Sequence, residues 1–370
     1  MVIRQTPRLC KGFTLVEVLL STAIIAVLIL ILVSITGQTS ATWRYTTAKI
    51  EQFRESRDAF ETITTKVSQA TLNTYWDYDN MTLPKRYERR SELRFISGPA
   101  SSLLGNGPAN TTRVTHCVFF HAPLGYADTG TYKGLEGLLN VWGYYLELNS
   151  DKTTRPAFVN SMPSPPPERF RFRLMEFMQP SDQLLTYSYT SGSGAGGVAA
   201  AISYQGKDWF KTPVNNSAST LSRPVAENII ALIITPRLSK RDEQQFNNSS
   251  PDYSPLSPDY SYDSSLTQNA GQSSTDPRTN PKNQLPPVVQ ITMVAIDETS
   301  AARLNLNSAS GDIFSLSSKF SDTTKYTGDL KFQTGGASLE NTLISMKVNY
   351  RIFTSNVPIR AAKWSRDQTN

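Results

Sequence analysis

Glu17 is the side chain whose placement most needs a chemical explanation. It lies near the start of an apolar run, from Phe13 to Ile35, in which it is the only charged residue. A carboxylate within such a run costs a few kcal/mol in a bilayer unless it is paired. Charge placement alone leaves two interpretations open. Either the side chain reaches the headgroups and the span proper begins at Val18, or the carboxylate has a cationic partner.

The other reactive side chains form no recognisable catalytic or metal site. His116 and His121 flank Cys117 on one short segment, and ligands on a single strand do not converge on a zinc ion. We therefore expect structural roles for the histidines and a buried thiol at Cys117. The remaining cysteine, Cys10, leaves no disulfide framework. The glycine-rich segment 191–197 lacks the ending of a phosphate-binding loop, and no GxSxG, HExxH or EF-hand pattern occurs. The sequence thus predicts no enzyme, no cofactor and no metal.

The net charge of +6 would indicate nucleic-acid binding only if it lay on the folded part of the chain. Arg4, Arg8 and Lys11 all lie in the first eleven residues, and removing these three charges leaves +3 for the rest. The arginines of segment 169–173 alternate with apolar residues and could contact DNA or lipid phosphates. Alternate arginines on the outer face of a strand are more often solvated, so we expect no nucleic-acid partner.

The apolar run predicts a single membrane-spanning helix. Its 23 residues, Phe13 to Ile35, are enough to cross the hydrocarbon of a bilayer. A secretory signal peptide has a shorter apolar region, of about 7–15 residues, followed by a small-residue cleavage site. Positive charge precedes the run, and positively charged flanks stay cytoplasmic. We expect residues 13–36 to span the membrane, the N-terminus to be cytoplasmic and the bulk of the chain to lie outside.

The helix is predicted to continue beyond the membrane as an amphipathic extension, residues 37–72. Side chains of one helical face recur there at spacings of three and four, and most charged residues lie off that face. The stripe, apolar except for its arginine, comprises Ile50, Phe53, Arg57, Phe60, Ile63, Val67 and Ala70. We expect the apolar members to pack against the rest of the chain.

After Asn73 the apolar period changes to two, which indicates half-buried strands. Helices and strands do not alternate in the way of parallel units, so we expect antiparallel sheet. The predicted fold class is α+β: a long N-terminal helix, half membrane and half amphipathic, packed on a β-rich globular head, residues 73–370, with long loops. The predicted strands cover residues 142–148, 170–174, 289–295 and 344–352, with shorter buried strands at 117–120 and 229–234.

Loops rich in turn-forming residues separate these strands. Residues 162–167 (MPSPPP) break regular structure. The longest loop, 247–287, is rich in Ser, Asp, Asn and Pro and contains PDYS twice, at 251–254 and 258–261. A stretch of this length without a core of its own is expected to be flexible or to form an extended surface excursion. We favour a solvated loop over one that binds a cation or a partner.

The residues around Glu17 resemble a known signal. The stretch KGFTLVE, residues 11–17, ends a short basic leader and opens the apolar run. It resembles the prepilin signature of type IV pilins and type II secretion pseudopilins, in which Gly precedes the cut, Phe follows it and Glu is fifth after it. The resemblance implies that a prepilin peptidase removes leader 1–12 between Gly12 and Phe13. It also implies N-methylation of the new Phe13 amine.

The same resemblance implies a role for Glu17 in assembly. In these families the apolar helix is retained and becomes the packing core of a filament. Within that dry helix bundle the Glu17 carboxylate can pair with the N-terminal amine of Phe13 on a neighbouring subunit. Each buried charge is then acceptable because it has a partner. Such a pair would set the step between subunits.

Part of the head is similar to one class of these proteins, the large J-type minor pseudopilins. In that class a late strand begins with Leu-Pro, and an Arg-containing strand end lies near the C-terminus. Here residues 285–292 (LPPVVQIT) and 356–360 (NVPIR) look similar. The spacing between the two segments differs from that class, and loop 247–287 is extra.

These features predict a minor pilin or pseudopilin, a structural subunit of a type II secretion pseudopilus or type IV pilus-like filament. The expected partners are the prepilin peptidase, other pilin or pseudopilin subunits, the inner-membrane assembly platform and the membrane. The expected location is the bacterial inner membrane, single-pass, with a periplasmic head, and then an extracytoplasmic filament. One alternative is a tip, adhesive or DNA-uptake pilin that binds a ligand through its head loops. Another is a membrane-anchored extracytoplasmic enzyme or binding protein.

Overall fold

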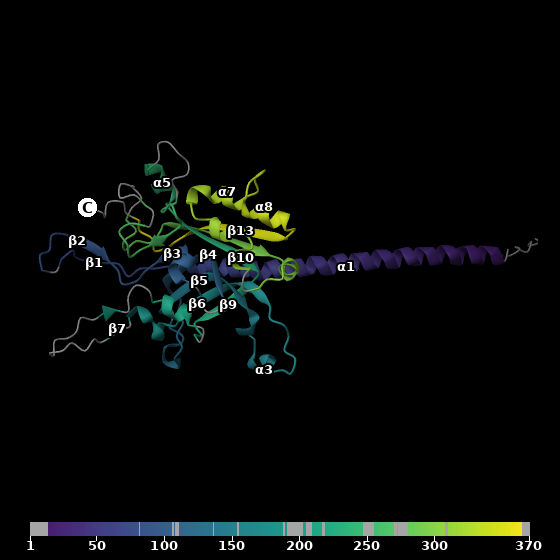
Figure 1. Cartoon of the computed structure of the whole chain (residues 1–370), viewed down its shortest axis with the longest axis horizontal. Coiled ribbons are helices and arrows are strands. Elements are labelled where there is room, and N and C mark those ends of the chain that lie inside the picture. The colour runs from purple at the N-terminus through teal and green to yellow at the C-terminus, as the bar shows by residue number, and fades with distance from the viewer. Residues whose placement is uncertain are drawn as a thin grey trace, which may run out of the picture. The chain divides into compact units, whose positions relative to one another are not determined.

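A computed structural model gives the arrangement of the 370-residue chain (Figure 1). The predicted leader, 1–12, and the predicted cleavage residues Gly12 and Phe13 lie outside the described residues. The chain divides into two compact units between Gln52 and Phe53. The structure describes residues 14–364 except 81, 106, 108–110, 136, 154, 188, 191–202, 205–208, 217–218, 247–254, 270–271, 273–279 and 308–309.

The described part of the first unit is helix, apart from Thr14. Helix α1 spans Leu15–Ser68 and thus continues into the second unit. Among the described residues, one stretch is long and apolar enough to cross a membrane, Leu15–Thr47, which ends later than the predicted span. The helix continues through the threonines after the apolar run, and the hydroxyls of Thr36, Thr42 and Thr46 donate to carbonyls one turn earlier. Thr36, for example, donates to the Leu32 carbonyl at 2.7 Å.

The second unit begins with residues 53–68 of α1. One face of this segment lies in the hydrophobic core, as the predicted stripe requires. The buried apolar residues are Ala59, Phe60, Ile63 and Val67, with Ala70 just beyond the helix. Arg57 of the same stripe is exposed and pairs with Glu61 at 2.8 Å. The helix ends at Ser68, shortly before the predicted end at residue 72.

A six-stranded antiparallel sheet forms one layer of the second unit. Its strand order is β11-β3-β4-β5-β6-β9, and the predicted strands 117–120, 142–148 and 170–174 lie within β4, β5 and β6. The long pairs of β5 with β4 and with β6 hold most of the sheet's buried side chains. The strands are β3 (Ile96–Pro99), β4 (Thr112–Pro123), β5 (Leu139–Ser150), β6 (Phe170–Gln179), β9 (Ser222–Glu227) and β11 (Tyr262–Asp263).

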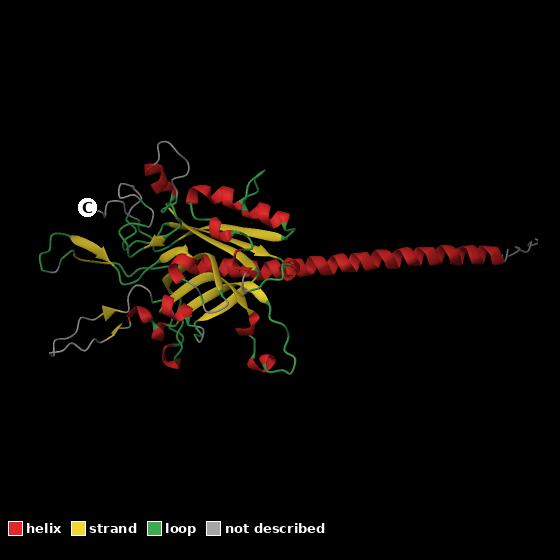
Figure 2. Ribbon diagram, in the orientation of Figure 1, coloured by secondary structure: helices red, strands yellow, loops and turns green. Residues whose placement is uncertain are grey.

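A three-stranded antiparallel sheet, in the order β10-β12-β13, forms the second layer. The chain passes from β9 to β10 at Asn228, whose φ of 60° is a left-handed value that asparagine tolerates better than most residues. The main core lies between the two sheets, and residues 53–68 of α1 pack against it (Figure 2). The strands are β10 (Ile229–Arg237), β12 (Val288–Ile296) and β13 (Tyr350–Pro358).

A second apolar cluster covers the other face of the six-stranded sheet. Phe119 of β4 stacks on Phe210 with ring centroids 4.3 Å apart, and Trp209 packs beside them. Gly143 of β5 makes this possible, because a Cβ at that position would lie 2.1 Å from the Phe119 ring. Two short helices add buried side chains to the cluster, α2 (Ala100–Leu104) and α4 (Lys211–Asn215).

Smaller elements complete the second unit. Strands β1 (Tyr75–Tyr78) and β2 (Tyr87–Arg90) form a hairpin, and β7 (Tyr189–Thr190) pairs with β8 (Ser203–Tyr204). The strand pairs of the described residues are antiparallel, which with the long helix confirms the α+β class. The remaining helices are α3 (Ala157–Asn160), α5 (Lys240–Phe246), α6 (Glu298–Arg303), α7 (Tyr326–Leu330) and α8 (Leu339–Ser345).

The predicted strand at 344–352 is wrong in its first part. Residues up to Ser345 belong to α8, and β13 begins only at Tyr350. Ser338 caps the helix by accepting a hydrogen bond from the Asn341 N–H at 3.2 Å. The buried residues of the helix, Leu339 and Leu343, are four apart. This helical spacing decides the structure, although the apolar alternation that follows it imitates a strand.

The described residues of segment 247–287 correct the expectation of a flexible loop without a core. Leu256, Tyr260 and Tyr262 are fully buried. The Tyr262 hydroxyl donates to the Gln284 carbonyl at 2.9 Å, and β11 adds an edge strand to the six-stranded sheet. The segment therefore packs into a core that distant parts of the chain supply, which its own composition does not reveal. The remaining residues of the segment lie outside the described ones.

Candidate processing and assembly site

The N-terminus of α1 is closed by reciprocal hydrogen bonds between Thr14 and Glu17. The Thr14 N–H and hydroxyl each donate to Glu17 Oε2 at 2.9 Å, and the Glu17 N–H donates to the Thr14 hydroxyl at 3.3 Å. This is a capping box, in which the N-cap residue and the third helical residue satisfy each other's backbone N–H groups. Both bonds to the carboxylate end on Oε2, so Oε1 has no partner among the described residues.

The capping box is a role of Glu17 that the sequence interpretation missed. The apolar run and the prepilin signature indicate only headgroups or another chain as partners of the carboxylate. The Thr-x-x-Glu spacing of residues 14–17, directly before an apolar run, is itself the sequence signal for a capping box. A cut after Gly12 would place the new amine of Phe13 one residue before Thr14 in the sequence. The capping box would then directly follow the mature N-terminus.

In the second unit, a buried carboxylate joins α1 to the six-stranded sheet. Glu176 of β6, whose side chain is 1% exposed, accepts hydrogen bonds from Lys66 of α1 at 2.7 Å and from Tyr144 at 2.7 Å. Arg223 binds the same carboxylate at 3.0 and 2.7 Å, and the Trp142 indole N–H donates to it at 2.9 Å. Burial raises the pKa of Glu176, but the bonds from Lys66, Tyr144 and Arg223 outweigh it and hold the pKa below its usual value. Glu176 is therefore ionised and ties the helix to the sheet.

Two of the three arginines predicted to be solvated, Arg171 and Arg173, are buried in ion pairs, which corrects the prediction for them, whereas Arg169 is exposed as predicted. Arg173 is 2% exposed and pairs with Glu227 at 2.9 Å, and the buried Arg171 pairs with Glu298 at 2.7 Å. The charges of Arg171 and Arg173 are thus compensated by carboxylates of the same chain. Across the sheet, cross-strand neighbours carry charges of alternating sign in the order Arg113, Glu147, Arg173 and Glu227.

His116 connects the two sheets in its neutral form. Its Nδ1 accepts a hydrogen bond from the Ile234 N–H of β10 at 3.2 Å, so its proton is on Nε2, which donates to the Phe320 carbonyl at 3.0 Å. Burial lowers the pKa of His116 to about 4, against the weaker effect of these bonds. The ring is a structural link, as expected.

His121 and Cys117 are also core residues. The His121 ring contacts the Thr186 hydroxyl at 2.8 Å and the Arg94 carbonyl at 3.1 Å, and burial lowers its pKa to about 4. Cys117 is fully buried, and its burial raises the pKa of the thiol. Within the part of the chain that the structure describes, no three or more His, Cys, Asp or Glu side chains are grouped as metal ligands.

These features define a class of protein: a long apolar N-terminal helix that opens with a capping box and leads into an antiparallel β-rich head. The family model of the prokaryotic N-terminal methylation motif matches residues 7–33. The chain therefore carries the prepilin-type signal of type IV pilins and pseudopilins, and the resemblance of residues 11–17 is confirmed. Comparison with curated proteins and with solved structures gives no match.

The matched motif ends before the head, so the similarity to J-type minor pseudopilins stays a prediction. The two segments on which it rests, 285–292 and 356–360, do lie side by side in the structure. Val289 of β12 pairs with Val357 of β13 in the antiparallel register. The Ile359 N–H also donates to the Pro287 carbonyl at 3.1 Å.

Proposed function

We propose that the protein is a structural, non-enzymatic subunit of a type II secretion pseudopilus or type IV pilus-like filament, of the minor type. The observation that carries this proposal is the methylation motif of residues 7–33 at the head of an apolar helix. The motif implies processing by a prepilin peptidase and assembly with other pilins. The cut lies between Gly12 and Phe13, and the new Phe13 amine is methylated.

In this proposal the precursor is a single-pass protein of the bacterial inner membrane. The basic residues Arg4, Arg8 and Lys11 keep the N-terminus cytoplasmic, which places the second unit in the periplasm. The apolar side chains of Leu15–Thr47 are exposed in the described chain. Lipid must cover them first, and the helices of other subunits cover them after the assembly platform has moved the chain into the filament.

Two properties of the second unit support a minor rather than a major subunit. The unit extends over residues 53–370 and carries a protruding hairpin, β1–β2, and a long excursion between β5 and β6, which a small major pilin would lack. The pairing of β12 with β13 also joins the two segments that look like J-type minor pseudopilins.

Isolation of filaments tests the proposal. Filaments sheared from the native cells should contain the chain in its processed form only. A Gly12→Ala variant should stay in the membrane, because the peptidase requires a residue with almost no side chain at the cut. Gly37→Ala is the matched control: no atom lies within 4 Å of the added Cβ, so this variant should be processed and assembled normally. Equal assembly of Gly12→Ala and wild type, or absence of the wild-type chain from the filaments, would refute the proposal.

A further inference from the structure

One face of the β1–β2 hairpin presents exposed aromatic rings. The register pairs Trp76 with Arg89 and Tyr78 with Tyr87, and these four residues share a face. Trp76 and Tyr87 are each 61% exposed, and Tyr78 is 43% exposed. The tyrosine rings stack with centroids 4.7 Å apart, and the Arg89 guanidinium lies 5.8 Å from the Trp76 ring centroid. We name these four residues the aromatic face.

The polar groups of the opposite face, which also carries the 43% exposed Tyr75, are paired within the chain, and the Tyr75 hydroxyl donates to Glu92 at 2.7 Å. Arg90 pairs with Asp77 at 3.7 Å, and Glu88 lies 3.0 Å from Arg86 and 3.6 Å from Lys282. A two-stranded hairpin is only marginally stable in water by itself. The contrast between a neutralised polar face and an exposed cluster of large rings indicates that another molecule covers the aromatic face.

The aromatic face offers hydrogen-bond donors. The Trp76 indole N–H has no partner among the described residues. The Arg89 side chain has one described partner, the Lys363 carbonyl at 3.2 Å. The Tyr87 hydroxyl donates to the Tyr78 hydroxyl at 3.0 Å, which leaves the Tyr78 proton free to be donated further. A hollow of about 400 Å³ adjoins the face and is lined in part by Trp76, Arg89 and Lys363. A fitting ligand therefore presents carbonyl oxygens and flat apolar rings.

The chain itself carries a segment with this chemistry, residues 162–167 (MPSPPP), which are exposed. Proline has no N–H and a fixed φ, so a proline-rich run favours the polyproline II conformation. Such a run presents pyrrolidine rings and carbonyl acceptors. The carbonyls of residues 162–165 have no hydrogen-bond partner among the described residues. The segment thus matches the donors and rings of the aromatic face.

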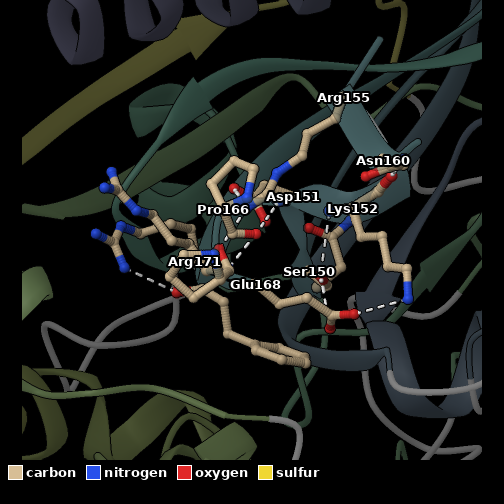
Figure 3. Close-up of polar contacts among 12 residues, drawn as sticks. Ser150, Asp151, Lys152, Arg155, Asn160, Pro166, Glu168 and Arg171 are labelled. Carbon is tan, nitrogen blue, oxygen red and sulfur yellow. Dashed lines mark hydrogen bonds and ion pairs between the residues drawn. The ribbon is translucent and has the colours of Figure 1, made fainter. Parts of the chain in front are cut away.

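Arg155 holds this segment in place. Its guanidinium donates to the Pro166 carbonyl at 2.7 Å, to the Pro167 carbonyl at 2.5 Å and to the Asp151 carboxylate at 2.7 Å (Figure 3). Asp151 also accepts from the Arg169 N–H at 2.9 Å, which closes the base of the excursion. A segment ordered before binding loses less conformational entropy when it binds.

The two surfaces are too far apart to meet within one chain. Figure 1 shows the β1–β2 hairpin and the excursion that carries α3 at opposite ends of the second unit. A contact between them must therefore join two copies. It uses a different surface on each copy, so it is heterologous, and heterologous contacts that do not close into a ring build open arrays.

The geometry points to binding of the proline-rich segment 162–167 of one copy by the aromatic face of a second copy. The pyrrolidine rings pack against Trp76 and Tyr87, and the Trp76 indole N–H donates to a carbonyl of residues 162–165. This is the way in which aromatic grooves recognise proline-rich peptides. A nucleic acid fits less well, because Arg86 and Arg90 of the hairpin and Lys282 beside it are already paired with carboxylates. The contact goes beyond the proposed function, since it does not involve the N-terminal signal.

Fluorescence anisotropy of a labelled peptide tests the contact. The probe is a synthetic peptide of residues 159–169, titrated with the full chain in detergent micelles. Saturable binding is expected. Trp76→Ala should weaken it at least tenfold, and Tyr87→Ala gives an independent second variant. Phe332→Ala is the matched control, because it removes another exposed ring, 58% exposed, far from the hairpin in the sequence, and should leave binding unchanged.

A second probe tests whether the prolines are recognised. In this peptide alanine replaces Pro163 and the prolines of 165–167, and it should not bind. Equal binding of the two peptides, or no binding of the wild-type peptide, would overturn the inference. Equal weakening by Trp76→Ala and Phe332→Ala would also overturn it, because the peptide would then bind without a specific site. So would saturable binding of a single-stranded oligonucleotide that displaced the wild-type peptide.

Discussion

Glu17 can serve two partners at once. Its Oε2 accepts the bonds from Thr14, which cap α1 and place the carboxylate at the positive end of the helix dipole. Its Oε1 has no partner among the described residues and can accept a hydrogen bond from the Phe13 amine of a neighbouring subunit in the proposed filament. The capping box therefore leaves one carboxylate oxygen free for an intersubunit pair in the proposed filament.

The Glu17→Gln variant separates these two roles. Gln keeps an acceptor for the Thr14 N–H but removes the charge, so membrane insertion should be intact or easier. Incorporation into the filament should fall, because the neighbouring ammonium loses its partner, a loss of about 3–5 kcal/mol when such a group is fully desolvated. Co-isolation with the other filament subunits, at equal membrane levels, measures the effect.

Thr14→Val is the control for Glu17→Gln. It weakens the capping box but keeps the charge, so incorporation should stay close to that of wild type. Equal incorporation of Glu17→Gln and wild type would show that the carboxylate is not needed for assembly. A loss of cleavage in Glu17→Gln would instead assign the residue to recognition by the peptidase.

The two buried histidines predict a loss of stability in mild acid. The unfolded chain protonates its histidines below about pH 6.5, whereas folding lowers the pKa of His116 and His121 to about 4. The folded state therefore keeps its full stability above about pH 6.5, where both histidines are neutral in the folded and the unfolded chain. Its free energy of unfolding falls progressively as the pH drops toward 4. The free energy of unfolding should drop by about 2 kcal/mol per histidine between pH 7 and pH 5. Urea unfolding at both pH values tests this, and an NMR titration in which either ring protonates near pH 6.5 would contradict it.

The role of a side chain could be predicted from the sequence where that role depends only on residues nearby in the chain. The signal of residues 11–17 is such a case, because every element of it is local. The arginines show the opposite: the partners of Arg173 and Arg171 lie 54 and 127 residues away, at Glu227 and Glu298. The burial of these arginines could not be predicted from the alternation of residues 169–173. The same alternation occurs whether the strand face that carries the arginines is exposed to solvent or covered by other parts of the chain.

At the scale of elements, the contact of α1 with the sheet depends on Lys66. Its Nζ lies 2.7 Å from Glu176 and 3.7 Å from the ring centroid of Trp142, so a salt bridge and a cation–π contact hold the same ammonium. These contacts fix the rotation of the helix about its axis. That rotation turns Ile63 and Val67 of the same helix into the core.

Glu176→Gln should therefore destabilise the second unit. The change leaves Lys66 largely buried without a countercharge, and breaking such a pair costs roughly 3 kcal/mol. Glu61→Gln is the matched control, because it breaks an exposed pair with Arg57 and should cost less than about 0.5 kcal/mol. Urea unfolding followed by tryptophan fluorescence measures both variants. Equal stability of the two would mean that the junction contributes no more than a surface ion pair.

Helices and strands could be predicted where a single apolar period extends over the whole length of the element. The regular alternation of β12 is an example. The prediction for the segment around α8 was wrong because two apolar periods overlap there. The leucines at 339 and 343 have helical spacing, and residues 344–348 alternate like those of a strand. The burial of Tyr260 and Tyr262 was not predictable either, because the core that receives them comes from other parts of the chain.

At the scale of the whole molecule, the boundary of the head lies within α1. The predicted domains treat residues 37–72 as an amphipathic extension of the helix that is separate from the head, whereas the second compact unit begins at Phe53. The reason is energetic: the side chains of Phe60, Ile63 and Val67 complete a core that the sheets alone leave open.

Two truncated chains test this boundary. A chain that begins at Phe53 should be soluble, have a circular-dichroism spectrum dominated by strand and melt cooperatively. A chain that begins at Thr71 lacks the buried helix and should show no cooperative melt. If both chains melted alike, residues 53–68 would not belong to the head, and a mainly helical spectrum of the longer chain would contradict the β-rich fold.

The mass of the N-terminal peptide of the protein from native membranes tests most directly whether the chain is processed as a prepilin. We expect a mature chain that begins at Phe13 and carries a methyl group on its amine, since residues 7–33 form a prepilin methylation motif at the head of an apolar helix that is retained in the proposed processing. A chain that keeps Met1 would be a plain membrane anchor. A chain that begins after Thr36 would have lost the helix as an ordinary signal peptide, and either result would contradict the proposed function.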